Sequence, residues 1–230
     1  MGYSARMNII AHIHTDLPEK FGVPRQSGLV DALEGRVIFT PEYRVPEALR
    51  GLEGFSHIWL LWLFSRNVRE SWTPTVRPPR LGGNTRLGVF ATRSPFRPNG
   101  IGLSCVRLES VELESDAGPV LHVAGVDMLD GTPIVDIKPY VPYADSRPEA
   151  RGGFTDGLDD TVLEVDIPED LRRLFSPIQL EALKGILAGD PRPRYQHDGT
   201  RVYAMTFGGS TVRFRVKDGR VEVLDVLPLN

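Results

Sequence analysis

Residues 104–137 read SCVRLESVELESDAGPVLHVAGVDMLDGTPIVDI, and this stretch decides the fold that we expect for the chain. It holds four short runs in which apolar residues alternate with polar ones or stay continuous, as in β-strands, separated by turn-forming residues. No helical pattern intervenes, so the strands are expected to pair antiparallel in a closed or sandwiched sheet. The predicted strands are 104–108, 111–114, 120–124 and 133–137, and the turns are 116–119 and 130–132.

The chain before this stretch continues the same pattern. The glycine-rich segment 82–88 precedes a strand rather than a helix and lacks the spacing of a phosphate-binding turn, so a Rossmann nucleotide site is not expected. The predicted fold class is mainly β, with an antiparallel barrel within residues 1–146. The further strands predicted for this barrel are 9–13, 35–39, 57–64 and 87–91.

A different organisation follows the predicted barrel. Residues 147–160 are rich in Pro, Gly and Asp and are predicted to form a linker or loop. Residues 161–230 are predicted to form a small α+β domain, whose helix begins after the N-cap Ser176 and ends at Gly189. Asp218-Gly219 is a strong hairpin signal between its last two strands. The strands expected in this domain are 162–167, 201–207, 211–216 and 220–227.

Composition sets broad limits on the kind of protein. A chain of 230 residues with 41% hydrophobic and 25% charged residues is ordinary for a globular protein, so disorder is excluded as the main state. The single Cys105 cannot close an intramolecular disulfide and no secretory signal is recognisable, so a cytoplasmic location is expected. The longest apolar run, 58–64, is too short to cross a bilayer, and no membrane association is expected.

The charge is unevenly distributed along the chain, although the formal net charge is only -3. Residues 66–108 contain eight arginines and one acidic residue, Glu70, whereas residues 109–170 contain sixteen acidic residues and three basic ones. The basic segment indicates a partner that carries phosphate. The alternative interpretation is that both segments are solvated surface and neutralise one another.

Two kinds of site are not expected. His12 and His14 share one face of the first strand without a third ligand nearby, so no metal site is predicted. Cys105 stands among apolar strand residues and is predicted to belong to the core rather than to act as a nucleophile.

The segment 77–104 combines prolines, glycines and arginines in an unusual density. Proline fixes φ and glycine permits close backbone approach, so this loop can be rigid while it presents Arg93 and Arg97 outward. Such a loop suits the binding of an anion or another ligand. The alternative interpretation is that these residues only turn the corners of a barrel and cap carbonyl groups. Segments 20–26 and 129–140 have a similar composition.

Taken together, the segments 20–26, 55–59, 77–104 and 130–140 resemble, in this order, the TsaA/TrmO family of tRNA methyltransferases. The run Asp190-Pro191-Arg192-Pro193, followed by strands, resembles the additional C-terminal domain of the bacterial members. Gly100 departs from the family pattern, in which many relatives carry proline, so the loop is expected to be freer here.

The resemblance implies an enzyme that uses S-adenosylmethionine on a β-barrel, usually as a homodimer. It further implies a tRNA substrate that reads ANN-type codons and carries N6-threonylcarbamoyladenosine at position 37, whose N6 is methylated. It also implies that certain loops line the cofactor pocket, where Arg25 or Arg93 is expected to meet an anionic group. The implied cofactor-binding residues are Pro24, Arg25, Gln26, Ser65, Arg66, Arg93, Leu103, Asp130, Gly131, Thr132 and Pro133.

The candidates for orienting or deprotonating N6 are Asp136, Lys138 and Tyr140, which alternate along one face of a predicted strand. N6 of the threonylcarbamoyl nucleoside belongs to a urea-like group and must lose its proton, so a nearby acceptor is useful. The alternative interpretation is a surface strand with an ordinary Lys and Asp pair. The residues predicted to bind tRNA, some of them in the C-terminal domain, are Arg77, Arg80, Arg97, Arg213 and Arg215.

Two other functions remain open at the level of sequence. One is a barrel that binds S-adenosylmethionine or a nucleotide as a sensor or RNA-binding module without catalysis. The other is methyl transfer to a different acceptor, because the acceptor pocket is marked less clearly than the cofactor loops. The basic segment 66–108 favours an RNA acceptor over an uncharged small molecule.

Overall fold

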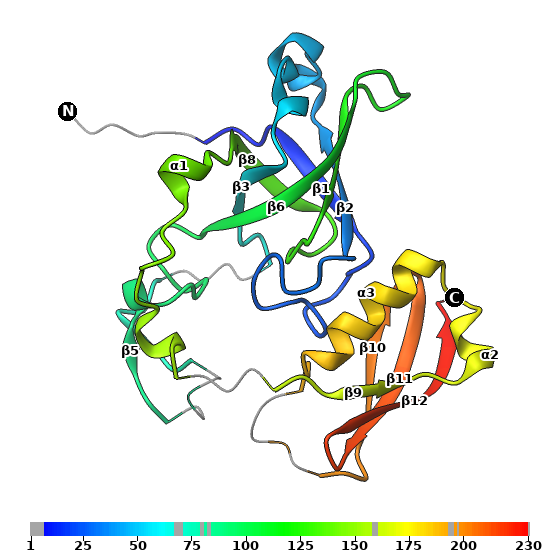
Figure 1. The fold of residues 1–230 in the computed structure, drawn as a ribbon. Coiled ribbons are helices and arrows are strands. Elements are labelled where there is room, and N and C mark those ends of the chain that lie inside the picture. The colour runs from blue at the N-terminus through cyan, green and yellow to red at the C-terminus, as the bar shows by residue number, and fades with distance from the viewer. Residues whose placement is uncertain are drawn as a thin grey trace.

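The structure, a computed structural model, describes residues 7–66, 71–78, 81, 84–157, 161–192, 196 and 198–229. Figure 1 shows a β-barrel formed by the first part of the chain and a smaller sheet with a helix formed by the last part. The mainly β class, with a barrel followed by a small α+β unit, is therefore confirmed.

Six antiparallel strands close the barrel in the order β1-β2-β7-β6-β3-β8. Because successive side chains of a strand point to opposite faces, every second residue fills the interior. Ile13, Val37, Ile58 and Ile134 are fully buried there. The barrel strands are β1 (Ala11–Thr15), β2 (Glu34–Phe39), β3 (His57–Leu63), β6 (Ile101–Glu112), β7 (Val120–Ala124) and β8 (Thr132–Pro139).

The structure differs from the sequence-based prediction at two places in this part. The predicted strands 104–108 and 111–114 merge into one continuous strand, β6, which ends at Glu112, because a register shift between Leu108 and Ser110 absorbs the break in alternation. The predicted strand 87–91 is mostly a 3-10 turn (Val89–Ala91), and only β5 (Leu87–Gly88) pairs, with β4 (Thr75–Val76). The amide of Thr92 donates to the Val89 carbonyl and closes that turn.

Short segments connect β6 to β7 and β7 to β8, whereas longer segments separate β1, β2, β3 and β6 along the chain. No strand occurs in the described part of the predicted linker, residues 147–157, which contains one 3-10 turn. The short helical elements described before the C-terminal part are the 3-10 turns Pro41–Tyr43, Pro46–Leu49, Leu52–Gly54, Val89–Ala91 and Gly153–Thr155 and the helix α1 (Pro142–Asp145).

The C-terminal part is a four-stranded sheet in the order β10-β11-β12-β9, with β9 parallel to β12. Ser176 caps α3 in a full capping box with Gln179, as the Ser-Pro start predicts. Asp218-Gly219, both with positive φ, turn the chain between β11 and β12. Its elements are β9 (Glu164–Asp166), α2 (Glu169–Arg172), α3 (Pro177–Ala188), β10 (Val202–Phe207), β11 (Ser210–Lys217) and β12 (Arg220–Pro228).

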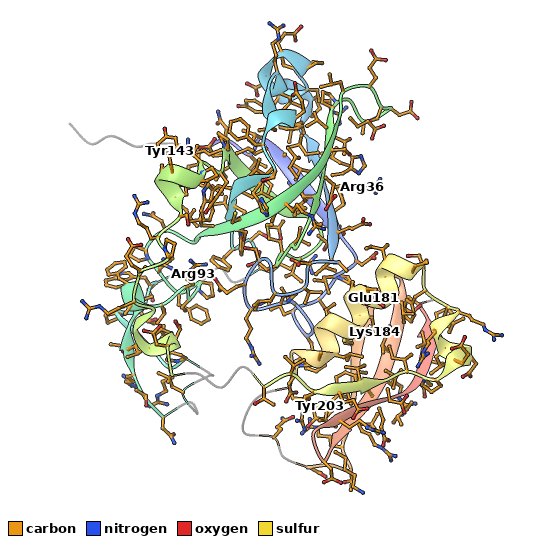
Figure 2. All side chains as sticks on the ribbon, viewed as in Figure 1. Arg36, Arg93, Tyr143, Glu181, Lys184 and Tyr203 are labelled. Atoms are coloured by element: carbon orange, nitrogen blue, oxygen red, sulfur yellow. The ribbon has the colours of Figure 1, made fainter. Side chains whose placement is uncertain are left out.

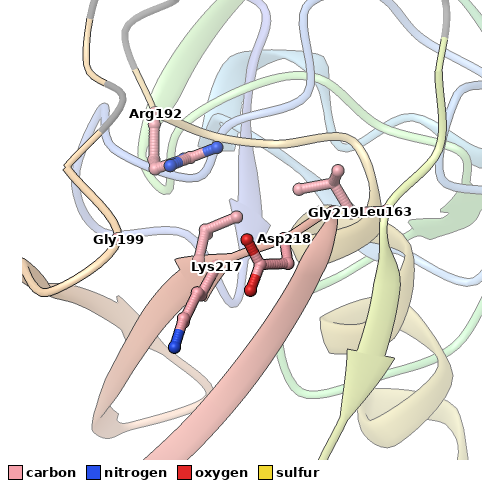
Figure 3. Close-up of a pocket in the computed structure, with 7 residues that line it drawn as sticks. Leu163, Arg192, Gly199, Lys217, Asp218 and Gly219 are labelled. Carbon is pink, nitrogen blue, oxygen red and sulfur yellow. The ribbon is translucent and has the colours of Figure 1, made fainter.

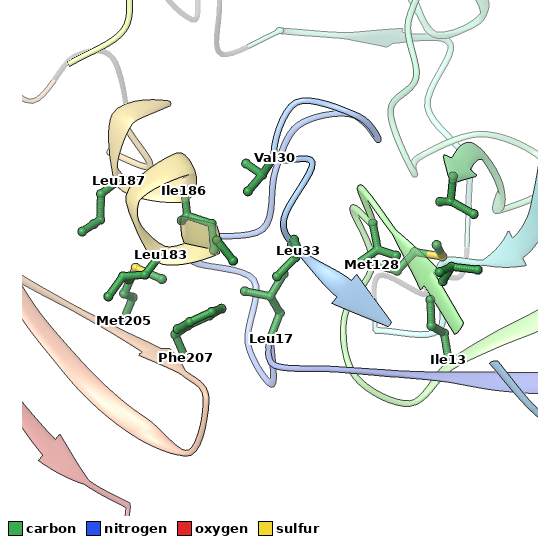
Figure 4. Packing of buried hydrophobic residues seen from close by; sticks show 14 of the residues in the cluster. Ile13, Leu17, Val30, Leu33, Met128, Leu183, Ile186, Leu187, Met205 and Phe207 are labelled. Carbon is green, nitrogen blue, oxygen red and sulfur yellow. The ribbon is translucent and has the colours of Figure 1, made fainter. Parts of the chain in front are cut away.

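The two parts share one hydrophobic core (Figure 4). Leu17, Val30 and Leu33, from the segment between β1 and β2, belong to the same buried cluster as residues of α3 and β10. The Gln179 amide donates to Asp16 Oδ2 (2.9 Å) across this contact. The C-terminal part is therefore fixed against the segment that carries the predicted cofactor residues 24–26.

Candidate functional site

A cavity of about 240 Å³ opens at one end of the barrel. Three stretches that are far apart in sequence line it: the end of β3 and the residues after it, the turn before β8, and the loop after β1. Ser65, Arg66 and Thr132, all predicted cofactor residues, are among the lining residues. The complete lining is Lys20, Val23, Trp62, Leu63, Phe64, Ser65, Arg66, Asp127, Met128, Leu129 and Thr132.

Arg66 connects the three lining stretches through hydrogen bonds. Its guanidinium donates to the carbonyl oxygens of Pro18 (2.7 Å) and Asp130 (3.4 Å). The Lys20 ammonium donates to the Arg66 carbonyl (3.0 Å). Two cationic groups are therefore positioned at the cavity by backbone contacts, which suits the binding of a carboxylate.

The turn Asp130-Gly131-Thr132 is held by the first strand. Asp130 Oδ1 accepts from the Thr15 amide (3.2 Å) and lies 3.1 Å from His14 Nδ1. Gly131 has φ 74°, a value that favours glycine, and the Thr132 hydroxyl donates to the Leu129 carbonyl (2.7 Å). The Asp130 side chain thus bonds to the neighbouring strand β1, and this contact orients the turn toward the cavity.

A buried polar chain crosses the inner wall of the cavity. Trp62 Nε1 donates to the Ser104 hydroxyl (3.0 Å), which in turn donates to Asp127 Oδ1 (2.6 Å). Burial raises the pKa of the Asp127 carboxyl, although the Ser104 hydrogen bond and the charge of Arg93 oppose the rise. Arg93 also donates to the Gln26 side chain, so two predicted cofactor residues meet beside Asp127.

Asp127 is a site residue that the sequence-based prediction missed. The available signal was a lone carboxylate between two apolar pairs, Gly125-Val126 and Met128-Leu129, in a chain segment that leaves a buried strand. A half-buried carboxylate in such a position needs hydrogen-bond donors, and the sequence does not show where they come from.

The predicted catalytic residues lie on the outer face of the barrel. Asp136 is opposite Leu61 and Lys138 is opposite Trp59, and the Tyr140 amide donates to the His57 carbonyl. Their alternation along one face is confirmed, and Lys138 Nζ lies 2.9 Å from Asp136 Oδ2. None of the three lines the cavity.

This outer face nevertheless adjoins the cavity. Leu61 is paired with Asp136 on one side and with Leu103, a predicted cofactor residue, on the other. Leu63, two positions along the same face of β3, lines the cavity. A ligand that extends out of the cavity over Leu63 therefore reaches the row that contains Leu103 and Asp136.

Other predicted cofactor residues make different contacts. The Arg25 guanidinium donates to the Asp190 carbonyl (3.1 Å) of the C-terminal part. Pro133 is buried in β8 opposite His12 and does not line the cavity. Pro24 is half-buried in the same loop as Arg25 and Gln26.

The residues predicted to bind tRNA are not equivalent. Arg213 and Arg215 form ion pairs across two strands with Asp225 (2.9 Å) and Glu222 (2.6 Å). Arg97 donates to the carbonyls of Thr92 and Ser94 within its own loop. Arg77 is exposed, and Arg80 lies outside the described residues.

The C-terminal part contains a second hollow, of about 360 Å³ (Figure 3). None of the predicted cofactor residues lines it. Arg192, at its edge, is paired with the Asp190 carboxylate (2.8 Å). This hollow is therefore separate from the cavity at the barrel end.

Within the described ranges, no group of three or more His, Cys, Asp or Glu residues is placed to hold a metal ion. The prediction that Cys105 belongs to the core is wrong, because the residue is half-buried on the outer face of β6, opposite Trp59. Among the helices described, none has the length and apolar character needed to span a membrane.

The fold and the cavity define a class of protein: a closed antiparallel barrel with a loop-lined cavity at one end, without a Rossmann sheet among the described residues. Residues 12–146 match the model of the tRNA-methyltransferase O N-terminal domain, and residues 161–229 match that of the TrmO C-terminal domain. The chain belongs to the tRNA-methyltransferase O family.

Similar proteins match this chain over most of its length. The chain is 40% identical over 227 residues to the tRNA (adenine(37)-N6)-methyltransferase of Escherichia coli, covering 95% of this chain and 96% of that protein. A Pseudomonas aeruginosa protein with the provisional name S-adenosylmethionine-dependent methyltransferase is 47% identical over 81% of each chain. The crystal structure of TrmO from P. aeruginosa superimposes with a TM-score of 0.79 at 36% identity, covering 100% of this chain and 99% of that one.

Proposed function

We propose that this protein transfers a methyl group from S-adenosylmethionine to N6 of adenosine 37 in tRNA, and that this adenosine carries the N6-threonylcarbamoyl group. The observation that carries the proposal is the cavity at the barrel end, where predicted cofactor residues from distant parts of the chain converge. The names of the E. coli and P. aeruginosa relatives support the reaction and the cofactor.

The cavity residues fit this cofactor chemically. Lys20 and Arg66 suit a carboxylate, and the rings of Trp62 and Phe64, 4.4 Å apart, together with Asp127 suit a cationic sulfonium. S-adenosylmethionine, when bound, supplies an electrophilic methyl group. The protein contributes by holding the reacting groups in line, which accounts for much of the rate in such transfers.

Asp136 is our candidate for accepting the N6 proton. Its carboxylate lies on the row of side chains that adjoins the cavity, and Lys138 Nζ lies 2.9 Å from Asp136 Oδ2. Tyr140 lies near Trp59, with ring centroids 5.8 Å apart, and the two rings form an aromatic surface beside the carboxylate. These residues orient the acceptor nucleoside and remove its proton.

The proposal includes the wider setting of the reaction. The substrate is a tRNA that reads ANN-type codons, the protein acts in the cytoplasm, and it is a homodimer. Arg77, Arg80 and Arg97 bind tRNA phosphates. Arg213 and Arg215 contribute less than Arg77 does, because carboxylates already neutralise them.

The decisive experiment uses purified protein, labelled S-adenosylmethionine and two preparations of threonine tRNA, with and without the threonylcarbamoyl group. Label that enters only the modified tRNA supports the whole proposal. Label in both tRNAs, or only in the unmodified one, overturns the substrate assignment. Cofactor binding without transfer to either RNA favours the non-catalytic sensor or another acceptor.

Two variants assign the roles within the site. Asp136→Asn is expected to lower kcat by about 10²- to 10⁴-fold with little change in KM for S-adenosylmethionine. Arg66→Ala is expected to raise that KM, because it removes a cation and loosens the turn at Asp130. Arg50→Ala, an exposed arginine in the turns between β2 and β3, is the matched control.

A further inference from the structure

Residues 71–97 leave the barrel after β3 and return to it at β6; we call the described part of this segment (71–78, 81 and 84–97) the arm. The chain that flanks the arm passes the cavity at Phe64. Phe64, which lines the cavity, donates its amide to the Gly100 carbonyl (2.9 Å), and the Thr73 amide donates to the Phe96 carbonyl (3.2 Å). The arm therefore projects from the rim of the candidate active site, on the side marked by β5 in Figure 1.

Two large aromatic side chains of the arm are stacked on each other and open to solvent. The rings of Trp72 and Phe90 lie 6.2 Å apart at an interplanar angle of 25°. Trp72 is 47% exposed and Phe90 is 73% exposed. Such a pair leaves apolar area in water that a partner can cover.

The backbone holds this aromatic pair in place. Val89, next to Phe90, is buried, and its amide donates to the Pro74 carbonyl (2.9 Å). The Thr92 hydroxyl donates to the Val89 carbonyl (2.9 Å) and closes the turn that carries Phe90. The rings are thus presented outward by a fixed turn, and little ordering is needed before a ligand binds.

The charge of the arm indicates an anionic partner. Residues 71–97 contain five arginines and no acidic residue. The register of β4 and β5, which pairs Val76 with Leu87, places Arg77 across from Arg86 at the end of the ribbon. Both are exposed, and no ion pair connects either of them to another described residue. Like charges opposite each other repel, so an anion between them is stabilising.

We propose that the arm binds an unpaired nucleotide of the RNA substrate, with its base stacked on the Trp72–Phe90 pair and its flanking phosphates at Arg77 and Arg86. An unpaired base exposes the π-face that stacking requires, whereas a duplex conceals it. This inference rests on the proposed function, because it assigns the arm to nucleotides beside the one that is methylated.

The test measures the affinity of the full-length protein for two RNAs of equal length: a hairpin with an anticodon-type loop and a blunt duplex. Trp72→Ala and Phe90→Ala are each expected to weaken hairpin binding by about 5- to 100-fold and to leave duplex binding unchanged. Arg77→Gln is expected to weaken both and to reduce the salt slope by about one.

Matched variants keep the result interpretable. Trp72→Phe is expected to retain hairpin affinity, and Tyr143→Ala, which removes another exposed aromatic ring on α1 (Figure 2), is expected to change nothing. Equal losses on hairpin and duplex, or no loss on either, overturn the inference. A change in sedimentation for Trp72→Ala with unchanged RNA affinity also overturns it and assigns the rings to a second copy.

The inference and the proposed function fail separately. Methylation of tRNA by the wild-type protein tests the proposed function and does not depend on the arm variants. If hairpin binding depends on Trp72 but the wild-type protein transfers no methyl group, the assignment of the arm to RNA binding still holds. The proposed methyl transfer is then wrong. If the protein methylates tRNA and neither aromatic substitution changes the KM for tRNA, the proposed function holds. The assignment of the arm to RNA binding is then wrong.

Discussion

At the scale of single residues, Asp127 is expected to make the stability of the protein depend on pH. Burial raises the pKa of its carboxyl in the folded protein, so the ionised form is favoured more in the unfolded chain. At low pH the carboxyl is protonated in both states and the free energy of unfolding is at its highest with respect to this group. As the pH rises through the folded-state pKa, the free energy of unfolding falls. Asp127→Asn is expected to gain stability relative to wild type as the pH is raised from about 4 to about 7.

Urea unfolding of both proteins over this pH range measures the effect. The exposed carboxylate variant Asp116→Asn serves as the control. A difference between wild type and Asp127→Asn that stays constant with pH contradicts the prediction.

Gly102 is required where β6 passes the wall of the cavity. A methyl group there would overlap the indole ring of Trp62, and the ring must move for alanine to fit. Such movement breaks the hydrogen bond from Trp62 to Ser104 and deforms the cavity. Gly102→Ala is expected to lower the free energy of unfolding by about 1–3 kcal/mol and to weaken cofactor binding.

Denaturant unfolding and calorimetry with S-adenosylmethionine check the two effects of Gly102→Ala. Gly54→Ala is the matched control, because nothing lies within 4 Å of a methyl group at that position. If Gly102→Ala has the same free energy of unfolding and the same cofactor affinity as the control, the indole ring of Trp62 does not restrict position 102 to glycine.

At the scale of elements, the start of α3 links local capping to the contact between the two parts of the chain. The Ser176 hydroxyl accepts from the Gln179 amide (3.3 Å), and the Gln179 side chain donates to Asp16. Ser176→Ala is expected to cost about 1 kcal/mol of stability, with Ser146→Ala as the control. Gln179→Ala is expected to cost more, since it also removes the bond to Asp16; equal thermal unfolding of the two variants would argue against this.

For the whole molecule, the shared core predicts a single cooperative unfolding transition. All three tryptophans, Trp59, Trp62 and Trp72, belong to the N-terminal part, so tryptophan fluorescence reports on that part alone. Gly185 lies on α3, and a methyl group there would approach Val30 to 2.8 Å. Gly185→Ala should gain about 1 kcal/mol of helix propensity but lose about 1–3 kcal/mol to this overlap.

We therefore expect Gly185→Ala to shift the unfolding midpoint measured by tryptophan fluorescence to lower denaturant concentration. The shift is expected although Gly185 lies in the C-terminal part and the tryptophans lie in the N-terminal part. Circular dichroism of the same samples should give the same midpoint. Two separate transitions, with an unshifted fluorescence midpoint, would show that the parts unfold independently.

The local features of this fold could be predicted from sequence because short-range physics decides them. Alternating apolar residues produced the barrel strands, Ser176-Pro177 started α3, and Asp218-Gly219 turned the chain between β11 and β12. The family resemblance also implied Ser65, Arg66 and Thr132 as cofactor residues, and all three line the cavity. Each of these signals is contained within a few neighbouring residues.

Other features were decided only by tertiary contacts. The pairing of Arg213 and Arg215 with carboxylates depends on the register of two strands, and the burial of Asp127 depends on a hydrogen-bond donor from β6. Phe90 was assigned to a strand, but it lies on an exposed turn because Val89 is anchored to Pro74. The common core of the two parts likewise joins residues such as Leu17 and Met205. Contacts between groups so distant in sequence leave no local pattern, so only the folded chain reveals them.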